Sequence, residues 1–224
     1  MPPALIPRPR AHLAEGAVHI PDWLGLERQR ELVAACREWS RPRTPGKPTL
    51  RNVRLPSGGV MSVRMLCLGW NWYPYGYSRT DVDGAPVPAL PESLVEYGRA
   101  AVADAFGDGS DYTPDVALVN YYDESARMGM HQDRDERSDA PVVSLSLGDT
   151  GIFRFGNAAG RGRPWTDVEL HSGDLVVFGG PARFAYHGVT KVLPGTGEPG
   201  IGLPSGRLNI TLRVSGREPA DSGA

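Results

Sequence analysis

The sequence has only two cysteines among its 224 residues, Cys36 and Cys67, and neither belongs to a CxxC pair. This argues against a zinc ribbon or a redox motif, and two reduced thiols in a cytoplasmic protein are the simplest interpretation. A disulfide between them is the alternative. The sequence also lacks an apolar run of membrane-spanning length and the apolar centre of a signal peptide. We therefore expect a soluble, cytoplasmic protein that does not bind a membrane.

A large excess of charge of either sign is also missing, since the formal net charge is −2. A nucleic-acid-binding protein with this balance needs a local positive surface. Residues 39–80 offer one, because they contain seven basic residues and no aspartate or glutamate. The aromatic residues in the second half of this segment are Trp70, Trp72, Tyr73, Tyr75 and Tyr77.

In nucleic-acid-binding proteins, basic side chains bind the backbone phosphates and aromatic rings stack on the bases. We therefore interpret residues 41–80 as a loop-rich lid that recognises the substrate. The alternative is that the aromatic residues belong to the core and the arginines to a solvated face.

Glycine (28 residues) and proline (21 residues) are abundant and spread along the chain, which is typical of short strands joined by turns. Apolar spacing predicts helices over residues 27–39 and 91–106. Strands are predicted over residues 17–20, 116–122, 142–147, 152–155, 175–178, 184–187 and 208–214. Helices followed by many strands predict a mainly β fold with flanking helices (α+β), most simply a jelly roll.

The length fits one domain, which we place at residues 17–216. Residues 1–16 are expected to be a flexible arm, residues 195–206 a flexible loop, and residues 217–224 a disordered tail.

His131 and Asp133 are two residues apart, so on a strand both side chains point the same way. His187 is the best candidate for a third ligand from a distant strand. Two imidazoles and one carboxylate form a triad that suits ferrous iron and leaves positions open for a co-substrate and O2. An isolated HxD pair also occurs by chance, and the triad would equally permit zinc in a hydrolase.

Polar residues alternate with apolar ones along residues 207–213, so Arg207, Asn209, Thr211 and Arg213 share one face. In a central strand that face is interior, where an arginine is costly unless it is paired with an anion such as a carboxylate. A bound dicarboxylate would explain the pattern, with Asn120 and Tyr122 as further contacts. A solvent-facing polar strand is the alternative.

Several motifs occur in an order that resembles the AlkB family of 2-oxoglutarate-dependent dioxygenases, and most closely its bacterial nucleic-acid repair branch. The resemblance covers roughly residues 58–214. The motifs are GVMSVRM (59–65), LGW (68–70), LVNYY (118–122), HQDRDE (131–136), APVVSLSLG (140–148), GDLVVFGG (173–180), YHG (186–188) and RLNITLR (207–213).

The resemblance implies a double-stranded β-helix in which His131, Asp133 and His187 bind Fe(II). It implies that Arg213 pairs with the distal carboxylate of 2-oxoglutarate, and that Leu118, Asn120, Tyr122, Arg207 and Asn209 complete that pocket. The residues that it places against the alkylated nucleotide are Met61, Trp70, Tyr77, Ser78, Arg79, Asp135 and Arg161. Arg79 stands where the repair member of the family has a tyrosine, which bears on substrate preference.

The implied activity is oxidative demethylation of bases such as 1-methyladenine and 3-methylcytosine in single-stranded DNA, with RNA as a second substrate. The products would be succinate, CO2 and formaldehyde. We expect a monomer without a protein partner. The alternatives are the same chemistry on RNA, protein or a small molecule, and a jelly-roll binding module without catalysis.

Overall fold

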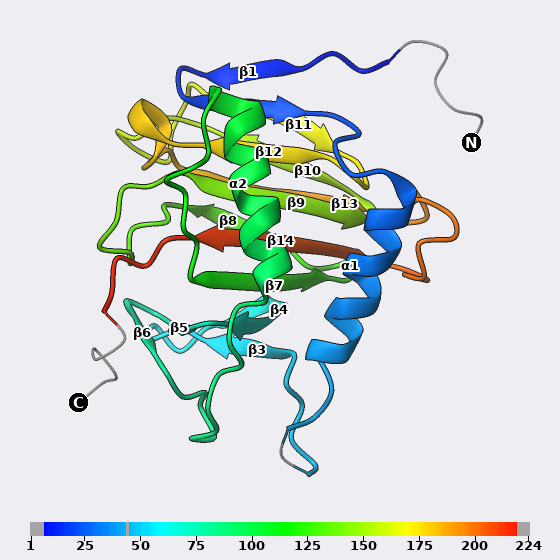
Figure 1. Ribbon diagram of the computed structural model, residues 1–224, viewed down its shortest axis with the longest axis vertical. Coiled ribbons are helices and arrows are strands. Elements are labelled where there is room, and N and C mark those ends of the chain that lie inside the picture. The colour runs from blue at the N-terminus through cyan, green and yellow to red at the C-terminus, as the bar shows by residue number, and fades with distance from the viewer. Residues whose placement is uncertain (1–6, 44, 219–224) are drawn as a thin grey trace.

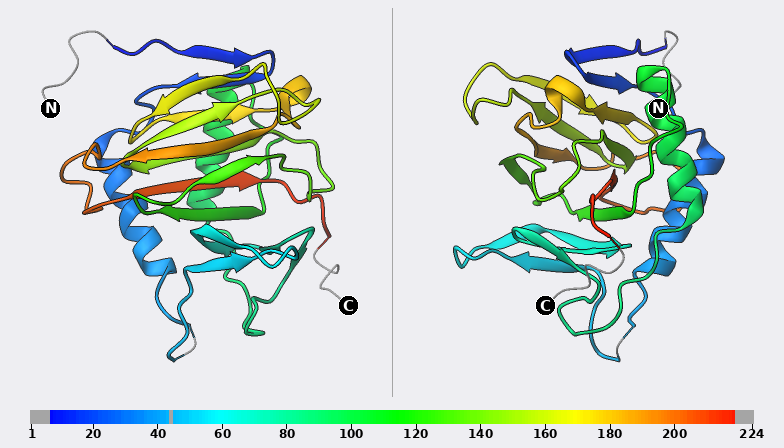
Figure 2. Two further views of the ribbon diagram at one scale, coloured as in Figure 1. Left: turned by 180° about the vertical axis from the view of Figure 1, so that it is seen from behind. Right: turned by 60° about the vertical axis from the view of Figure 1, so that its left-hand side comes forward.

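Two antiparallel sheets form the body of the protein, and two helices cover the outer face of the larger one (Figures 1 and 2). The structure, a computed structural model, describes residues 7–43 and 45–218. In spatial order, the large sheet consists of β1 (Ala11–Ala14), β2 (Ala17–Ile20), β12 (Leu175–Phe178), β9 (Val142–Gly148), β14 (Arg207–Arg213), β7 (Val116–Tyr122), β4 (Val60–Leu68) and β3 (Arg51–Arg54). The small sheet consists of β11 (Thr166–Leu170), β10 (Thr150–Phe155), β13 (His187–Leu193) and β8 (Met128–His131). The predicted mainly β jelly roll with flanking helices is confirmed.

The remaining elements lie outside these sheets. The helices are α1 (Leu26–Trp39) and α2 (Glu92–Phe106), and a short 3-10 helix, η1, covers Gly180–Ala182. Strands β5 (Asn71–Tyr73) and β6 (Gly76–Ser78) pair with each other, and we call residues 71–78 the lid hairpin. No helix in the described ranges is both long enough and apolar enough to cross a membrane.

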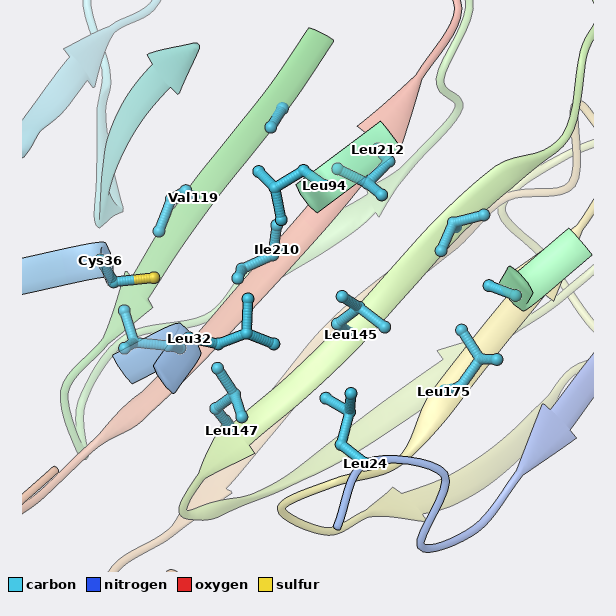
Figure 3. Packing of buried hydrophobic residues seen from close by; sticks show 14 of the residues in the cluster. Leu24, Leu32, Cys36, Leu94, Val119, Leu145, Leu147, Leu175, Ile210 and Leu212 are labelled. Atoms are coloured by element: carbon cyan, nitrogen blue, oxygen red, sulfur yellow. The ribbon is translucent and has the colours of Figure 1, made fainter. Parts of the chain in front are cut away.

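The helices lie on the large sheet because each buries one apolar stripe. Leu32, Val33 and Cys36 of α1 are buried, and Leu94 and Ala101 lie on the buried face of α2. They pack on leucine, isoleucine and valine side chains from the outer face of β7, β9, β12 and β14 (Figure 3). A second cluster, rich in phenylalanine, fills the space between the two sheets. The large sheet is therefore buried on both faces.

Strand β14 confirms the pattern read from its alternating residues. Leu208, Ile210 and Leu212 belong to the core beneath the helices. The four polar residues between them point to the opposite face and are also buried. Because β14 lies between β7 and β9 in the middle of the large sheet, the solvent-facing alternative is wrong.

The structure corrects three predictions about local structure. Residues 11–14 form edge strand β1, so the expected arm is wrong for them, while residues 1–6 lie outside the described ranges. Residues 184–186 are not in a strand; β13 begins at His187 and ends at Leu193. Residues 41–80 are not a loop-rich lid as a whole, because they include β3, β4, β5 and β6, and β4 pairs with β7 inside the large sheet.

The loop before β14 and the described start of the C-terminal segment, residues 217 and 218, are held more firmly than expected. Asp149 accepts backbone N–H bonds from Thr196, Gly197 and Gly206 at 2.9–3.1 Å, so residues 195–206 are tied down at both ends. Arg217 lies over the ring of Tyr77, 5.5 Å from its centroid. The predicted disordered tail otherwise lies outside the described residues from 219 onward. Cys36 and Cys67 are unpaired and buried, as expected.

Asp174, buried beneath the N-terminal strands, provides a test of stability. It accepts bonds from Arg8 at 2.6 and 2.7 Å and from His19 at 2.9 Å. Burial alone would raise the pKa of Asp174, but His19 and Arg8 outweigh it and lower that pKa to about 2. A lowered pKa means that this stabilisation is complete above the unfolded-state pKa near 4 and is lost as the pH falls toward 2.

Replacing Arg8 with alanine should therefore lower the free energy of unfolding by about 1 kcal/mol at pH 7, because His19 and the backbone N–H of Asp22 supply the rest of the lowering. It should also flatten the pH dependence of that free energy between pH 2 and pH 4. Urea unfolding over this pH range would measure both effects. Arg154→Ala, which removes an ion pair with Asp167 at the surface, is the control and should change little. An unchanged acid limb in Arg8→Ala would contradict the assignment.

Candidate metal and co-substrate site

The structure brings His131, Asp133 and His187 together, with one ligand atom from each within 4.8 Å of the others. His131 ends β8 and His187 begins β13, and the two residues are direct partners across the small sheet. The Nε2 atoms of His131 and His187 lie 3.5 and 3.7 Å from the two oxygens of Asp133. Asp133 lies beyond the end of β8, so irregular backbone rather than strand alternation places it beside His131.

Both imidazoles are oriented through their second nitrogen. Nδ1 of His131 donates to the carbonyl of Gly129 at 2.9 Å, and Nδ1 of His187 donates to the carbonyl of Ala185 at 3.0 Å. A carbonyl can only accept, so the neutral form of each ring keeps its lone pair on Nε2, as metal-binding histidines require. Burial and the nearby His131 lower the pKa of His187 to about 4, so His187 is neutral at physiological pH.

Asp133 completes a donor set that fits a divalent cation. Its Oδ1 accepts a 2.7 Å bond from Arg213, whereas its Oδ2 is buried and has no hydrogen-bond partner among the residues that the structure describes. Burial alone would raise the pKa of Asp133, but Arg213 and His187 outweigh it and hold the pKa below its ordinary value. A buried carboxylate oxygen without a partner normally requires one. Two imidazoles and one carboxylate suit Fe(II).

A cavity of about 100 Å³ extends from this triad between the two sheets. It is lined by every residue that the resemblance placed around 2-oxoglutarate, namely Leu118, Asn120, Tyr122, Arg207, Asn209 and Arg213. Oδ1 of Asn120 is buried and accepts no hydrogen bond from the described part of the chain. The cavity is therefore polar at several points that no protein group satisfies.

The two arginines of β14 lie at opposite ends of that strand. Arg213 is beside the metal ligand and is already paired with Asp133 and Glu136. Arg207 is 1% exposed. Within residues 7–43 and 45–218 its guanidinium bonds only neutral groups, the Ser146 hydroxyl at 2.8 Å and the Leu170 carbonyl at 3.1 Å. Burial lowers the pKa of Arg207, as expected for a cation without a carboxylate in contact. Of the two, Arg207 is the one that needs an anion.

The predicted substrate residues divide into two groups. Met61 and Asp135 line the cavity. Trp70, Tyr77, Ser78, Arg79 and Arg161 do not. Trp70 is fully buried and donates to Asp115 at 2.9 Å, with Arg79 stacked 3.5 Å from its ring centroid. The ring of Trp70 is therefore not accessible to a base in this structure.

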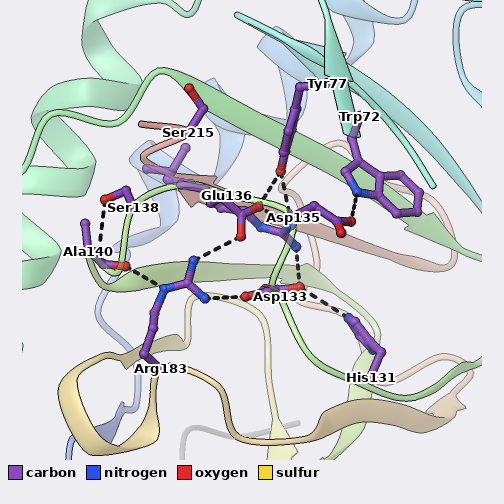
Figure 4. Close-up of polar contacts among 12 residues, drawn as sticks. Trp72, Tyr77, His131, Asp133, Asp135, Glu136, Ser138, Ala140, Arg183 and Ser215 are labelled. Carbon is purple, nitrogen blue, oxygen red and sulfur yellow. Dashed lines mark hydrogen bonds and ion pairs between the residues drawn. The ribbon is translucent and has the colours of Figure 1, made fainter. Parts of the chain in front are cut away.

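Trp72 lines the cavity, whereas Trp70 does not. The sequence did not decide whether Trp72 belongs to the core or contacts the substrate. Nε1 of Trp72 donates to Oδ2 of Asp135 at 2.8 Å (Figure 4). Ser78 bonds the carbonyl of Thr80, and Arg161 lies 5.8 Å from the ring centroid of Tyr186. The side chain of Tyr77 is buried and bonds Glu136.

The acid-free segment is less positive in the fold than in the sequence. Arg43 pairs with Asp81 at 2.9 Å. Lys47 and Arg51 both pair with Asp83, at 2.9 and 2.8 Å. The two aspartates follow directly after the segment, so three of its cations are neutralised by the next loop.

Two residues of the site were missed in the sequence. Glu136 and Arg183 are buried beside Asp133 and bond each other at 3.0 Å (Figure 4). Glu136 stands inside the HQDRDE motif, which was a signal for it. Arg183 follows η1, far from every motif residue it contacts, and nothing in its local sequence marked it.

Comparisons with known proteins agree with this geometry. The model of the 2OG-Fe(II) oxygenase superfamily matches residues 16–213. The "Alpha-ketoglutarate-dependent dioxygenase AlkB homolog" of Caulobacter vibrioides is 39% identical, over 86% of this chain and 84% of that protein. "Alpha-ketoglutarate-dependent dioxygenase AlkB" of Escherichia coli is 38% identical, over 75% of this chain and 78% of that protein.

A more distant group of relatives is named for a different lesion. "DNA N(6)-methyladenine demethylase ALKBH1D" of Arabidopsis thaliana is 32% identical over 88% of this chain, which spans 49% of that protein. Among solved structures, "The structure of OsALKBH1" covers 91% of this chain and 100% of that chain, at a TM-score of 0.76 and 32% identity.

Proposed function

Because the chain belongs to the AlkB family within the 2OG-Fe(II) oxygenase superfamily, we propose that it removes methyl groups from the ring nitrogens of bases in single-stranded nucleic acid. The chain is a 2-oxoglutarate- and Fe(II)-dependent dioxygenase that dealkylates nucleic acids. The single observation that carries the proposal is the intact triad at one end of a cavity with an unpaired buried arginine at the other. Neither a non-catalytic binding module nor a zinc hydrolase would need both a metal triad and a buried arginine in the same cavity.

Arg207, rather than Arg213, is proposed to hold the distal carboxylate of 2-oxoglutarate. This reverses the assignment made from the sequence. Arg213 is held at the metal end by Asp133 and Glu136, whereas Arg207 lies buried at the far end of β14 without a counter-ion. The guanidinium fork of Arg207 suits a bidentate carboxylate. Asn120 and Tyr122 line the cavity between the two ends.

His131, Asp133 and His187 would hold the iron through both Nε2 atoms and Oδ2. Bound Fe(II) supplies the activation of O2 that couples conversion of 2-oxoglutarate to succinate and CO2 with oxidation of a methyl group. The buried walls keep water away from this step. Once a methyl group on nitrogen carries a hydroxyl, its C–N bond breaks to release formaldehyde and the unmodified base.

The mouth of the cavity provides the contacts for the base. Trp72 and Met61 offer apolar surface, and Asp135 has one carboxylate oxygen bonded to Trp72 and the other available to accept from an exocyclic amine. An amine beside the alkylated nitrogen occurs in 1-methyladenine and 3-methylcytosine. Single-stranded DNA is the proposed substrate and RNA a second one, because a base must leave the stack to enter the cavity. The monomeric state and the cytoplasmic location stay predictions.

Mass spectrometry of methylated oligonucleotides would test the proposal. DNA and RNA carrying 1-methyladenine, 3-methylcytosine or N6-methyladenine would be incubated with enzyme, Fe(II), 2-oxoglutarate and ascorbate. We expect the loss of one methyl group from the first two lesions only when 2-oxoglutarate is present. Turnover of N6-methyladenine alone would show that the substrate is instead the modified base after which the plant relatives are named. Turnover of none would refute the proposed substrate class.

Gly151 on β10 leaves room for Arg207, and this gives a further prediction. A Cβ at position 151 would lie 2.8 Å from Nε and 3.0 Å from Cζ of Arg207. Gly151→Ala should displace the guanidinium and raise the KM for 2-oxoglutarate roughly tenfold, because displacements of about 1 Å have effects of this size or larger. Gly160→Ala, with open space around it, is the control. An unchanged KM in Gly151→Ala would speak against Arg207 as the anchor.

A further inference from the structure

Glu136 is a buried carboxylate surrounded by donors, although it is not one of the three metal ligands (Figure 4). Its side chain is 0% exposed. One oxygen accepts from Arg183 at 3.0 Å, and the other accepts from Arg213 at 3.0 Å and from the hydroxyl of Tyr77. A buried carboxylate is costly to keep charged unless it is paired. Glu136 is paired with two arginines, Arg183 and Arg213, and each of them also bonds to the metal ligand Asp133.

The two arginines that bind Glu136 also bind Asp133. Arg213 donates to Oδ1 of Asp133 at 2.7 Å, and Arg183 donates to the backbone carbonyl of Asp133 at 2.5 Å. Arg183 is fixed further by a 2.8 Å bond to the carbonyl of Ala140. Asp133 is thereby held through its side chain and its backbone, with only Oδ2 left for a metal.

On its other side, the same loop is bonded to the lid hairpin. Tyr77 of β6 donates to Glu136, and Trp72 of β5 donates to Asp135. Asp135 and Glu136 follow Asp133 by two and three residues. The hairpin that lines the mouth of the cavity is thus joined by hydrogen bonds to the loop that carries the metal ligand.

We propose that Glu136 is a positioning residue that links the lid hairpin to the metal ligand Asp133 through Arg213. The cluster contains two guanidinium groups and two carboxylates, so its positive and negative charges are equal in number. Without the charge of Glu136, both arginines would face Asp133 alone, Arg213 would compete with the metal for it, and an excess positive charge would oppose a cation. Nucleic acid that contacts the hairpin would act on the metal site along the same bonds, and this second half rests on the proposed function.

Metal binding without any substrate tests the first half. Mn(II) titrations followed by electron paramagnetic resonance should show Glu136→Gln weakening Mn(II) binding about 10- to 100-fold, the range for partners of metal ligands. Glu124→Gln, an exposed carboxylate after β7, is the matched control and should bind Mn(II) like the wild type. Folding of each variant is checked by circular dichroism. A folded Glu136→Gln variant with wild-type Mn(II) affinity would overturn the positioning role.

Removal of the Tyr77 hydroxyl tests the second half and does not depend on Glu136→Gln folding. Tyr77→Phe keeps the ring among Met65, Cys67 and Trp70. It removes the bond to Glu136 and the longer, 3.4 Å bond that the hydroxyl accepts from Arg213. We expect unchanged Mn(II) affinity, but at least about fivefold less stimulation of 2-oxoglutarate turnover by a methylated oligonucleotide. The ratio of succinate to formaldehyde should rise. Tyr73→Phe, on the same hairpin and 45% exposed, is the control.

The double variant distinguishes a connected pathway from two separate effects. If the link passes through Glu136, Tyr77→Phe should reduce stimulation no further in a Glu136→Gln background. Additive losses, or wild-type stimulation in Tyr77→Phe, would overturn the link. If no methylated oligonucleotide stimulates even the wild type, the link to nucleic acid fails together with the proposed function. The Mn(II) titration then decides the positioning role alone.

Discussion

His131→Ala is expected to reduce 2-oxoglutarate turnover to below about 1% of wild type, because even partners of metal ligands change metal affinity 10- to 100-fold. His131 is the most exposed ligand, with a side chain 37% accessible. Its loss leaves the core intact, so the variant should fold and unfold like the wild type. Succinate formation and Mn(II) binding would be measured together.

His171→Ala is the matched control for this variant. His171 is similarly exposed, at 41%, and lies 3.6 Å from Glu169 rather than in the cavity. We expect wild-type turnover from it. Full turnover by His131→Ala in the presence of iron would remove His131 from the metal site.

Arg207→Met is expected to affect co-substrate binding and protein stability differently. Losing a charged partner buried against a carboxylate costs at least about 2 kcal/mol, so the KM for 2-oxoglutarate should rise at least about 30-fold. The free energy of unfolding without 2-oxoglutarate should not fall, since a buried cation without a counter-ion is replaced by an apolar side chain of similar length.

Steady-state kinetics and urea unfolding of the same preparations would test this pair of effects. Arg154→Met, which removes a surface ion pair, should leave the KM unchanged. If Arg207→Met destabilised the protein strongly and kept its KM, Arg207 would be a structural residue. A large rise in KM for an Arg213 variant without loss of metal affinity would restore the assignment made from the sequence.

Periodic features were read correctly from the sequence. Alternation along residues 207–213 predicted a polar interior face, and β14 has that face. The apolar stripes of residues 27–39 and 91–106 predicted two helices, which end within a residue or two of those limits. These features depend on neighbours along the chain, and local periodicity records them.

Strand limits were predicted less well where pairing decided them. Residues 184–187 are apolar and aromatic, yet the strand there begins at His187 because β8 and β10 provide its hydrogen-bond partners only from that point. Strand β4 was overlooked because its neighbouring arginines and aromatic residues suggested a lid. Its pairing with β7 places it in the sheet.

The sequence by itself determined the chemistry of this protein, because His131, Asp133, His187 and the two arginines of β14 are recognisable by residue type and order. Only the tertiary structure decided which partner each one has. It paired Arg213 with Asp133, left Arg207 without a carboxylate, buried Trp70 and brought Trp72 to the cavity. Ion pairing and burial depend on groups far apart in the chain, and a one-dimensional pattern carries no record of which of them meet.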